Sequence, residues 1–132
     1  MTKIFIDTDV FIDFLAGRKP WSDHAARLFT RIERMEIDAY TSSLTIRNLY
    51  DALREHAAHD RAVRALTDLT GMIGILPVDL EIIEKALQSD FPGLDTAIQY
   101  YCAEAEKVNA IISRNIRDYR ISEIPVVGPE GI

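Results

Sequence analysis

The sequence predicts an α/β domain of three α/β/α layers, built on a mostly parallel sheet of four or five strands. Strand-like and helix-like segments alternate along the chain, which requires crossover connections and helices on both faces of the sheet. The length of 132 residues suits one ordinary domain, so residues 1–132 are expected to form a single domain. Hydrophobic residues make up 48% of the chain, which is enough for a core.

The first half of the chain predicts two strands and four helices. Residues 3–6 are strand-like, and residues 10–16 predict a helix that Gly17 closes. Ser22 is expected to cap the next helix, and residues 38–42 predict the second strand. The apolar side chains expected to face the core are Ala25, Leu28, Phe29, Ile32 and Met35, then Ile46, Leu49, Tyr50 and Leu53, and, behind an expected cap at Asp60, Val63, Leu66 and Leu69.

The second half predicts three strands and two helices. The strands are expected at residues 73–78, 109–113 and 125–127. Asp79 is expected to cap one helix, and the other is expected to run from Asp95. Their expected core-facing side chains are Leu80, Ile83 and Leu87, then Ile98, Tyr101, Cys102 and Ala105.

Charge and cysteine content exclude several classes of protein. The net charge of −6 argues against non-specific nucleic-acid binding through a basic surface. No apolar run approaches the roughly 20 residues that span a bilayer, so no membrane partner is expected. The lone Cys102 cannot form an internal disulfide, and the first residues do not resemble a signal peptide. A cytoplasmic location is therefore expected.

Oxygen-bearing side chains stand where the predicted strands end, the edge at which open parallel sheets bind ligands. They are Asp7, Thr8 and Asp9 after the first strand, Asp95 before the last helix, and Ser113, Asn115 and Asp118 after the fourth strand. Hard oxygen ligands suit Mg²⁺ or Mn²⁺, and such a cation supports phosphodiester hydrolysis. Structural roles remain open as well: Asp7 and Asp95 could cap helices or strand ends, and Asp118 could be a solvated loop residue.

Four sequence blocks resemble PIN-domain ribonucleases, many of which are toxins of VapBC-type toxin–antitoxin pairs. The blocks are residues 4–15, 41–45, 95–103 and 111–119, in the family's order and over almost the whole chain. The resemblance implies a PIN-like fold and Mg²⁺- or Mn²⁺-dependent cleavage of RNA. It also implies a small antitoxin protein as partner and, as in many PIN relatives, a homodimer.

The resemblance also assigns roles to residues. Asp7, Asp95 and Asp118 are the implied metal ligands, and Asn48 and Asn115 join them as catalytic-site residues. Further candidates are Thr8, Asp9, Asp51 and Ser113 in the site, and Arg114 and Arg117 as contacts to the RNA backbone. Arg114 and Arg117 could equally be a solvated face.

The sequence departs from the family pattern at four positions. Asp9 stands where the family usually has asparagine, and Asn48 where it usually has glutamate. The third acidic position holds Thr96, with Asp95 one residue earlier. The fourth position is Asn115, with Asp118 behind it. Asparagine at the second and fourth positions resembles a PIN subgroup.

Three functions follow as hypotheses. The first is a metal-dependent endoribonuclease that acts as a toxin. The second is a PIN-like module that binds RNA or protein without efficient cleavage, which the departures at Asn48 and Thr96 favour. The third is a phosphatase, because Asp7-Thr8-Asp9 matches the Asp-x-Asp of haloacid-dehalogenase-type enzymes, although the Gly-Thr that normally follows is missing.

Overall fold

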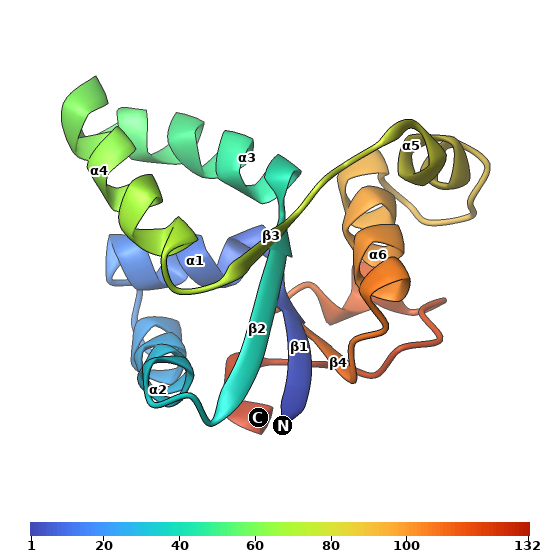
Figure 1. Ribbon diagram of the computed structural model, residues 1–132, viewed down its shortest axis with the longest axis horizontal. Coiled ribbons are helices and arrows are strands. Elements are labelled where there is room, and N and C mark those ends of the chain that lie inside the picture. The colour runs from blue at the N-terminus through green and yellow to red at the C-terminus, as the bar shows by residue number, and fades with distance from the viewer.

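The computed structural model describes residues 1–132 and has one parallel sheet covered by helices on both faces (Figure 1). The strands are β1 (Thr2–Ile6), β2 (Ile37–Ser42), β3 (Gly74–Leu76), β4 (Ala110–Ile112) and β5 (Val126–Val127). They lie in the order β3-β2-β1-β4-β5, and every neighbouring pair is parallel. The predicted fold class is confirmed, and each predicted strand exists with bounds that differ by a few residues.

Two layers of helices cover the sheet. One layer holds α1 (Thr8–Ala16), α2 (Trp21–Glu33), α3 (Ser43–Arg54) and α4 (His59–Thr70). The other layer holds α5 (Leu80–Leu87) and α6 (Leu94–Glu106), with a short 3-10 helix at Ile116–Tyr119. A second 3-10 helix, Pro129–Gly131, ends the chain. None of these helices is both long enough and apolar enough to cross a membrane.

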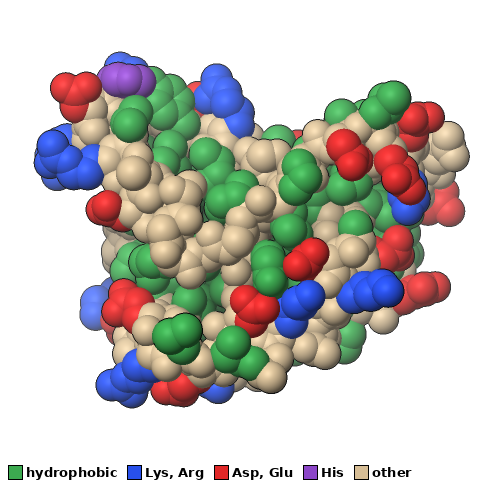
Figure 2. All heavy atoms as spheres, in the orientation of Figure 1, with side chains coloured by type: hydrophobic (Ala, Val, Ile, Leu, Met, Phe, Trp, Pro, Cys, Tyr) green, Lys and Arg blue, Asp and Glu red, His purple; other side chains and the backbone are tan.

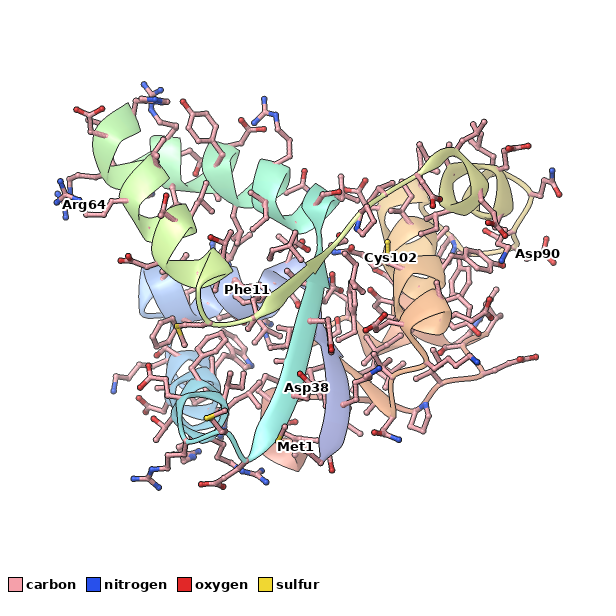
Figure 3. All side chains as sticks on the ribbon, viewed as in Figure 1. Met1, Phe11, Asp38, Arg64, Asp90 and Cys102 are labelled. Atoms are coloured by element: carbon pink, nitrogen blue, oxygen red, sulfur yellow. The ribbon has the colours of Figure 1, made fainter.

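The central strands supply both halves of the core. Ile4 and Ile6 pack with α1 and α2, whereas Phe5 faces α5 and α6, because successive side chains of a strand point to opposite faces. Phe11 of α1 and Cys102 of α6 accordingly lie on opposite sides of the sheet (Figure 3). A strand segment buried on both faces is apolar throughout, as residues 4–6 of β1 and the three residues of β4 are.

The register of β1 and β4 brings two polar residues together. Ile6 pairs with Ile112, and the backbone N–H of Asp7 donates to the carbonyl of Ile112 at 2.9 Å. Asp7 and Ser113 therefore follow adjacent central strands, as the sequence predicts. The carboxylate of Asp7 also accepts from the backbone N–H of Thr8 at 2.8 Å, which makes Asp7 the N-cap of α1.

Helix ends are predicted correctly at some positions and wrongly at others. Gly17 closes α1 in the left-handed conformation with φ 65°, and Asp79 caps α5 by accepting from the N–H of Ile82. The caps predicted at Ser22 and Asp60 are wrong. Helix α2 begins one residue before Ser22, at Trp21, and α4 begins at His59, so both residues lie within the first helical turn.

Several side chains expected in the core face solvent. Exposed fractions are 78% for Met35, 41% for Val63, 70% for Leu80 and 67% for Leu87, and Ala105 is also exposed. Helix α5 instead buries Ile82 and Ala86, which lie one turn apart, against α6. The apolar stripe of α5 is wider than the face it buries, so periodicity alone selected the wrong edge of the stripe.

Candidate metal and active site

Asp7 is the centre of the polar cluster at the carboxyl ends of β1 and β4. Its Oδ1 accepts from the N–H of Thr8 at 2.8 Å and from Nε2 of Gln99 at 3.3 Å. Its Oδ2 accepts from Oγ of Ser113 at 2.9 Å and from the hydroxyl of Tyr119 at 3.0 Å. A carboxylate offers about four lone-pair positions, so protein donors hold Asp7 in one orientation.

Gln99 of α6 links this carboxylate to β2 and α3. Its side chain is 2% exposed, and its Nε2 donates to Oγ1 of Thr45 at 2.7 Å as well as to Asp7. Its Oε1 accepts from the hydroxyl of Ser42. The sequence interpretation missed Gln99 as a site residue. The available signal was a polar residue on a helical stretch of otherwise apolar positions, since buried polar groups require partners.

Asp9 carries the one buried polar side-chain atom that lacks a hydrogen-bond partner. Its Oδ2 accepts from the backbone N–H of Arg114 at 2.8 Å and from Oγ of Ser113 at 3.4 Å, but its buried Oδ1 accepts from nothing. Burial, and then the charge of Asp7, raises the pKa of Asp9 to about 6. A free carboxylate oxygen beside a second carboxylate is a donor set that fits a divalent cation.

Tyr119 lies beside three of the candidate acids. Burial raises the pKa of its hydroxyl above the ordinary tyrosine value, and the charges of Asp7, Asp9 and Asp118 raise this pKa further. Asp118 is half-buried, and its backbone N–H donates to the carbonyl of Asn115 at 3.0 Å. The negative charge of Asp118 therefore acts on the same hydroxyl that orients Asp7.

Asn48 and Asp95 form a separate, outer contact. Nδ2 of Asn48 donates to Oδ2 of Asp95 at 3.4 Å, joining α3 to the first turn of α6. Helix α6 begins at Leu94 after a Gly93 cap, so Asp95 is not the N-cap, and its carboxylate is exposed. The structure thus brings Asn48 to Asp95. Separately, it gathers Asp9, Ser113 and Gln99 around Asp7, and no hydrogen bond joins these two groups of residues.

The remaining predicted residues divide between the cluster and the surface. Thr8 shares a hydrogen bond with Thr45 at 3.1 Å and belongs to the cluster. Asp51 is exposed and accepts from Arg47 at 2.8 Å, and it has no hydrogen bond to the cluster. Asn115 and Arg117 are exposed. No group of three or more His, Cys, Asp or Glu side chains is arranged to hold a metal ion.

Arg114 is already engaged by protein groups. Its guanidinium donates to both oxygens of Asp13, through Nε to Oδ2 and through Nη2 to Oδ1, the latter at 3.0 Å. The same guanidinium lies over the ring of Trp21, 4.0 Å from the ring centroid. Acidic and basic side chains are interspersed on the face drawn in Figure 2, which shows no extended basic surface.

The model of the PIN domain family matches residues 3–117. The chain belongs to the PIN domain family. This match confirms the resemblance drawn from the four sequence blocks and removes the reason for a haloacid-dehalogenase interpretation. Comparison with curated protein sequences gives no match.

Solved structures share the fold of this PIN domain. A DNA-bound VapBC from Salmonella typhimurium has a TM-score of 0.74 at 17% identity, covering 98% of this chain and 99% of that one. A toxin–antitoxin complex from Klebsiella pneumoniae has a TM-score of 0.70 at 23% identity, with 96% and 97% covered. VapC20 of Mycobacterium tuberculosis, described as a toxin that cleaves the sarcin–ricin loop, has a TM-score of 0.65 at 16% identity, with 82% and 86% covered.

Proposed function

We propose that this PIN domain is a metal-dependent endoribonuclease that hydrolyses RNA phosphodiesters as the toxin of a toxin–antitoxin pair. The observation that carries the proposal is the pairing of Asp7 with Asp9. Asp7 is fixed by four donors, and Asp9, which shares the Ser113 hydroxyl with Asp7, has a second, buried oxygen without a partner. Natural proteins pair almost all buried polar atoms, so such an oxygen suggests a ligand.

Mg²⁺ or Mn²⁺ fits this donor set. Asp9 would hold the cation through its free Oδ1, and Asp7 would exchange one of its four hydrogen bonds for the cation. Asp95 and Asp118 are the further carboxylates near the same edge of the sheet. Mg²⁺ usually binds one or two carboxylates and completes its shell with water and substrate phosphate, so a site without three clustered acids is adequate. When bound, the cation supplies Lewis-acid activation of water and stabilises negative charge on a phosphoryl oxygen.

The chain's own residues orient the acids and receive the RNA. Gln99, Ser113 and Tyr119 fix the direction of the Asp7 carboxylate. Asn115 and Arg117, both exposed beside the site, are the residues available to a phosphate backbone. With a net charge of −6, the chain needs a bound cation to make the local field favourable for phosphate.

An apolar groove supports a protein partner. Phe14, Leu15 and Met72 line it between α1, α2 and α4, although they are 40%, 45% and 37% exposed. Exposed apolar grooves on soluble proteins mark interaction sites. An antitoxin is the proposed occupant, because the VapBC and Klebsiella neighbours are toxin–antitoxin complexes. Leu15→Asp should abolish copurification with the antitoxin encoded by a neighbouring gene, and unchanged copurification would reject this groove.

A homodimer is part of the proposal as well. Leu80 and Leu87 of α5 expose 70% and 67% of their surface on one stripe, which a second copy can cover. Light scattering should show a dimer at tens of micromolar, where an interface of roughly 1,600 Å² persists. A monomer at that concentration would remove the homodimer.

The alternative function is a PIN-like module that binds RNA or protein without cleaving RNA. Thr96 in place of an acid, and the absence of three clustered carboxylates, favour this alternative. Incubation of the purified chain with RNA in Mn²⁺ or in EDTA separates the two functions. Cleavage that requires Mn²⁺ supports the nuclease, whereas RNA binding without cleavage in Mn²⁺ supports the binding module.

A further inference from the structure

Arg114 contacts α1 at two points through two different parts of the residue. Its backbone N–H donates to Oδ2 of Asp9 at 2.8 Å, and its guanidinium forms a two-point contact with Asp13. Asp9 and Asp13 are four residues apart and lie on the same face of α1. The segment that follows β4 is therefore fixed along one side of α1 by two carboxylates.

The anchoring contact is buried, whereas the acid that it positions retains an open oxygen. Asp13 is 1% exposed, and the side chain of Arg114 is 29% exposed and covered on one face by Trp21. A bidentate pair of arginine and carboxylate fixes direction as well as distance. Ser113, the residue before Arg114, donates to both Asp7 and Asp9, so its position depends on the same segment.

We infer that Arg114 is a positioning residue for the cation site, held by Asp13 and acting on Asp9 through its backbone N–H. This inference rests on the proposed function, because it assumes a cation at Asp7 and Asp9. It reverses the sequence expectation that Arg114 contacts RNA backbone. The guanidinium points to Asp13 and Trp21, and the effect of Arg114 reaches the site through the main chain.

Positioning by Arg114 and charge repulsion from Arg114 predict opposite changes in cation affinity when the Arg114 side chain is removed. Arg114 is a cation close to Asp9, so by Coulomb's law its removal should strengthen the binding of another cation. If Arg114 positions Asp9, its removal should weaken cation binding, because Oδ1 and Oδ2 of Asp9 lose their fixed direction. Residues that orient metal ligands typically contribute roughly 10–100-fold to metal affinity.

The test is calorimetric titration of the metal-free full chain with Mn²⁺, in the absence of RNA. Arg114→Ala should weaken Mn²⁺ binding by about tenfold or more, and Arg114→Lys should lie between this variant and the native protein. The double variant Asp13→Asn with Arg114→Gln removes both charges and leaves no buried charge unpaired. It should bind Mn²⁺ as weakly as Arg114→Ala. If Arg114→Ala fails to fold, the titration is read from the double variant in its place.

Arg18→Ala is the matched control. Nη1 of Arg18 lies 3.8 Å from the same carboxylate of Asp13, but Arg18 has no hydrogen bond or ion pair with Ser113, Arg114 or Asp9. Its removal deletes a nearby positive charge without releasing the segment after β4. Mn²⁺ affinity in Arg18→Ala should stay within about twofold of the native value, well short of the roughly tenfold positioning effect.

Amide hydrogen exchange separates failure of the inference from failure of the proposed function. The amide of residue 114 should be protected in the native protein and in Arg18→Ala, and should exchange faster in Arg114→Lys and in the double variant. If the native protein binds Mn²⁺ and Arg114→Ala binds it equally or more tightly, the inference is wrong. If the native protein binds no Mn²⁺, the proposed function fails. Exchange at residue 114 that is unchanged in Arg114→Lys and in the double variant would show separately that the Arg114 side chain does not hold the segment at Asp9.

Discussion

The hydroxyl of Tyr119 donates to Oδ2 of Asp7 at 3.0 Å across 112 residues of sequence. Tyr119 is 2% exposed, and burial together with the charge of Asp7 raises the pKa of its hydroxyl, so this hydroxyl remains a donor at neutral pH. The first and last polar residues of the site are thereby joined in the core. The direction of the Asp7 carboxylate therefore depends on the segment that follows β4 as much as on β1.

Tyr119→Phe should lower the free energy of unfolding by about 1.5–3 kcal/mol, the usual contribution of a hydrogen bond to a charged group. The ring and its packing beside Phe91 remain, so the loss reports the hydrogen bond to Asp7. Urea denaturation measures it. Tyr101→Phe is the control, because Tyr101 is half-buried and makes no side-chain hydrogen bond, and an equal loss in both variants would contradict the assignment.

Thr96→Asp should strengthen Mn²⁺ binding. Thr96 lies three residues before Gln99 on α6, and Gln99 contacts Asp7, so a carboxylate at position 96 would face the same cluster. An added negative ligand increases the affinity for a divalent cation. Calorimetric titration with Mn²⁺ measures the change, and Ala97→Ser serves as a neighbouring control. Unchanged affinity in Thr96→Asp would show that α6 directs this position away from the cation.

Asn48→Glu tests the outer contact. Asn48 donates to Asp95, so a glutamate there places two negative charges together and should lower the stability of the metal-free protein. Mn²⁺ should recover that stability if both carboxylates face the cation. Thermal melts with and without Mn²⁺ measure the difference. Identical Mn²⁺ affinity and stabilisation in Asn48→Glu and the native protein would show that Asn48 is not the second acidic position of the family pattern.

Cys102 should resist alkylation while the protein is folded. Burial, and then the charge of Asp79, raises the pKa of its thiol to about 11. At pH 8 only about one thiol in a thousand is then the reactive thiolate, and reactivity should rise only as the pH approaches 11. Labelling with a thiol reagent in buffer and in urea measures this protection. Equal labelling rates in both conditions would contradict the burial of Cys102.

The fold was predictable because its strongest signals are local. The apolar runs of β1 and β4, and the capping residues Gly17 and Asp79, act over a few residues, so they are visible in sequence order. The wrong predictions concern side chains whose burial depends on packing between elements that are distant in sequence. Whether Leu80 or Ile82 faces inward is decided by how α5 meets α6, and a broad apolar stripe satisfies both choices.

Part of the candidate site's geometry was predictable for the same reason. Asp7 and Ser113 end strands, and parallel strands end at one edge, so their contact follows from topology. The pairing of Asp13 with Arg114 joins residues 101 positions apart, and no spacing rule indicates it. Gln99 likewise acts through a side-chain direction that only the placement of α6 across the sheet determines.

RNA cleavage in Mn²⁺ by the native protein and by Asp7→Asn shows whether Asp7 belongs to a cation-dependent nuclease. The substitution keeps the side-chain shape, and the Ser113 and Tyr119 hydroxyls can turn to accept from the new amide group, so the variant should fold. We expect Mn²⁺-dependent cleavage by the native protein, and in folded Asp7→Asn the loss of both cleavage and calorimetric Mn²⁺ binding. Undiminished cleavage and Mn²⁺ binding in Asp7→Asn would show that Asp7 holds no catalytic cation.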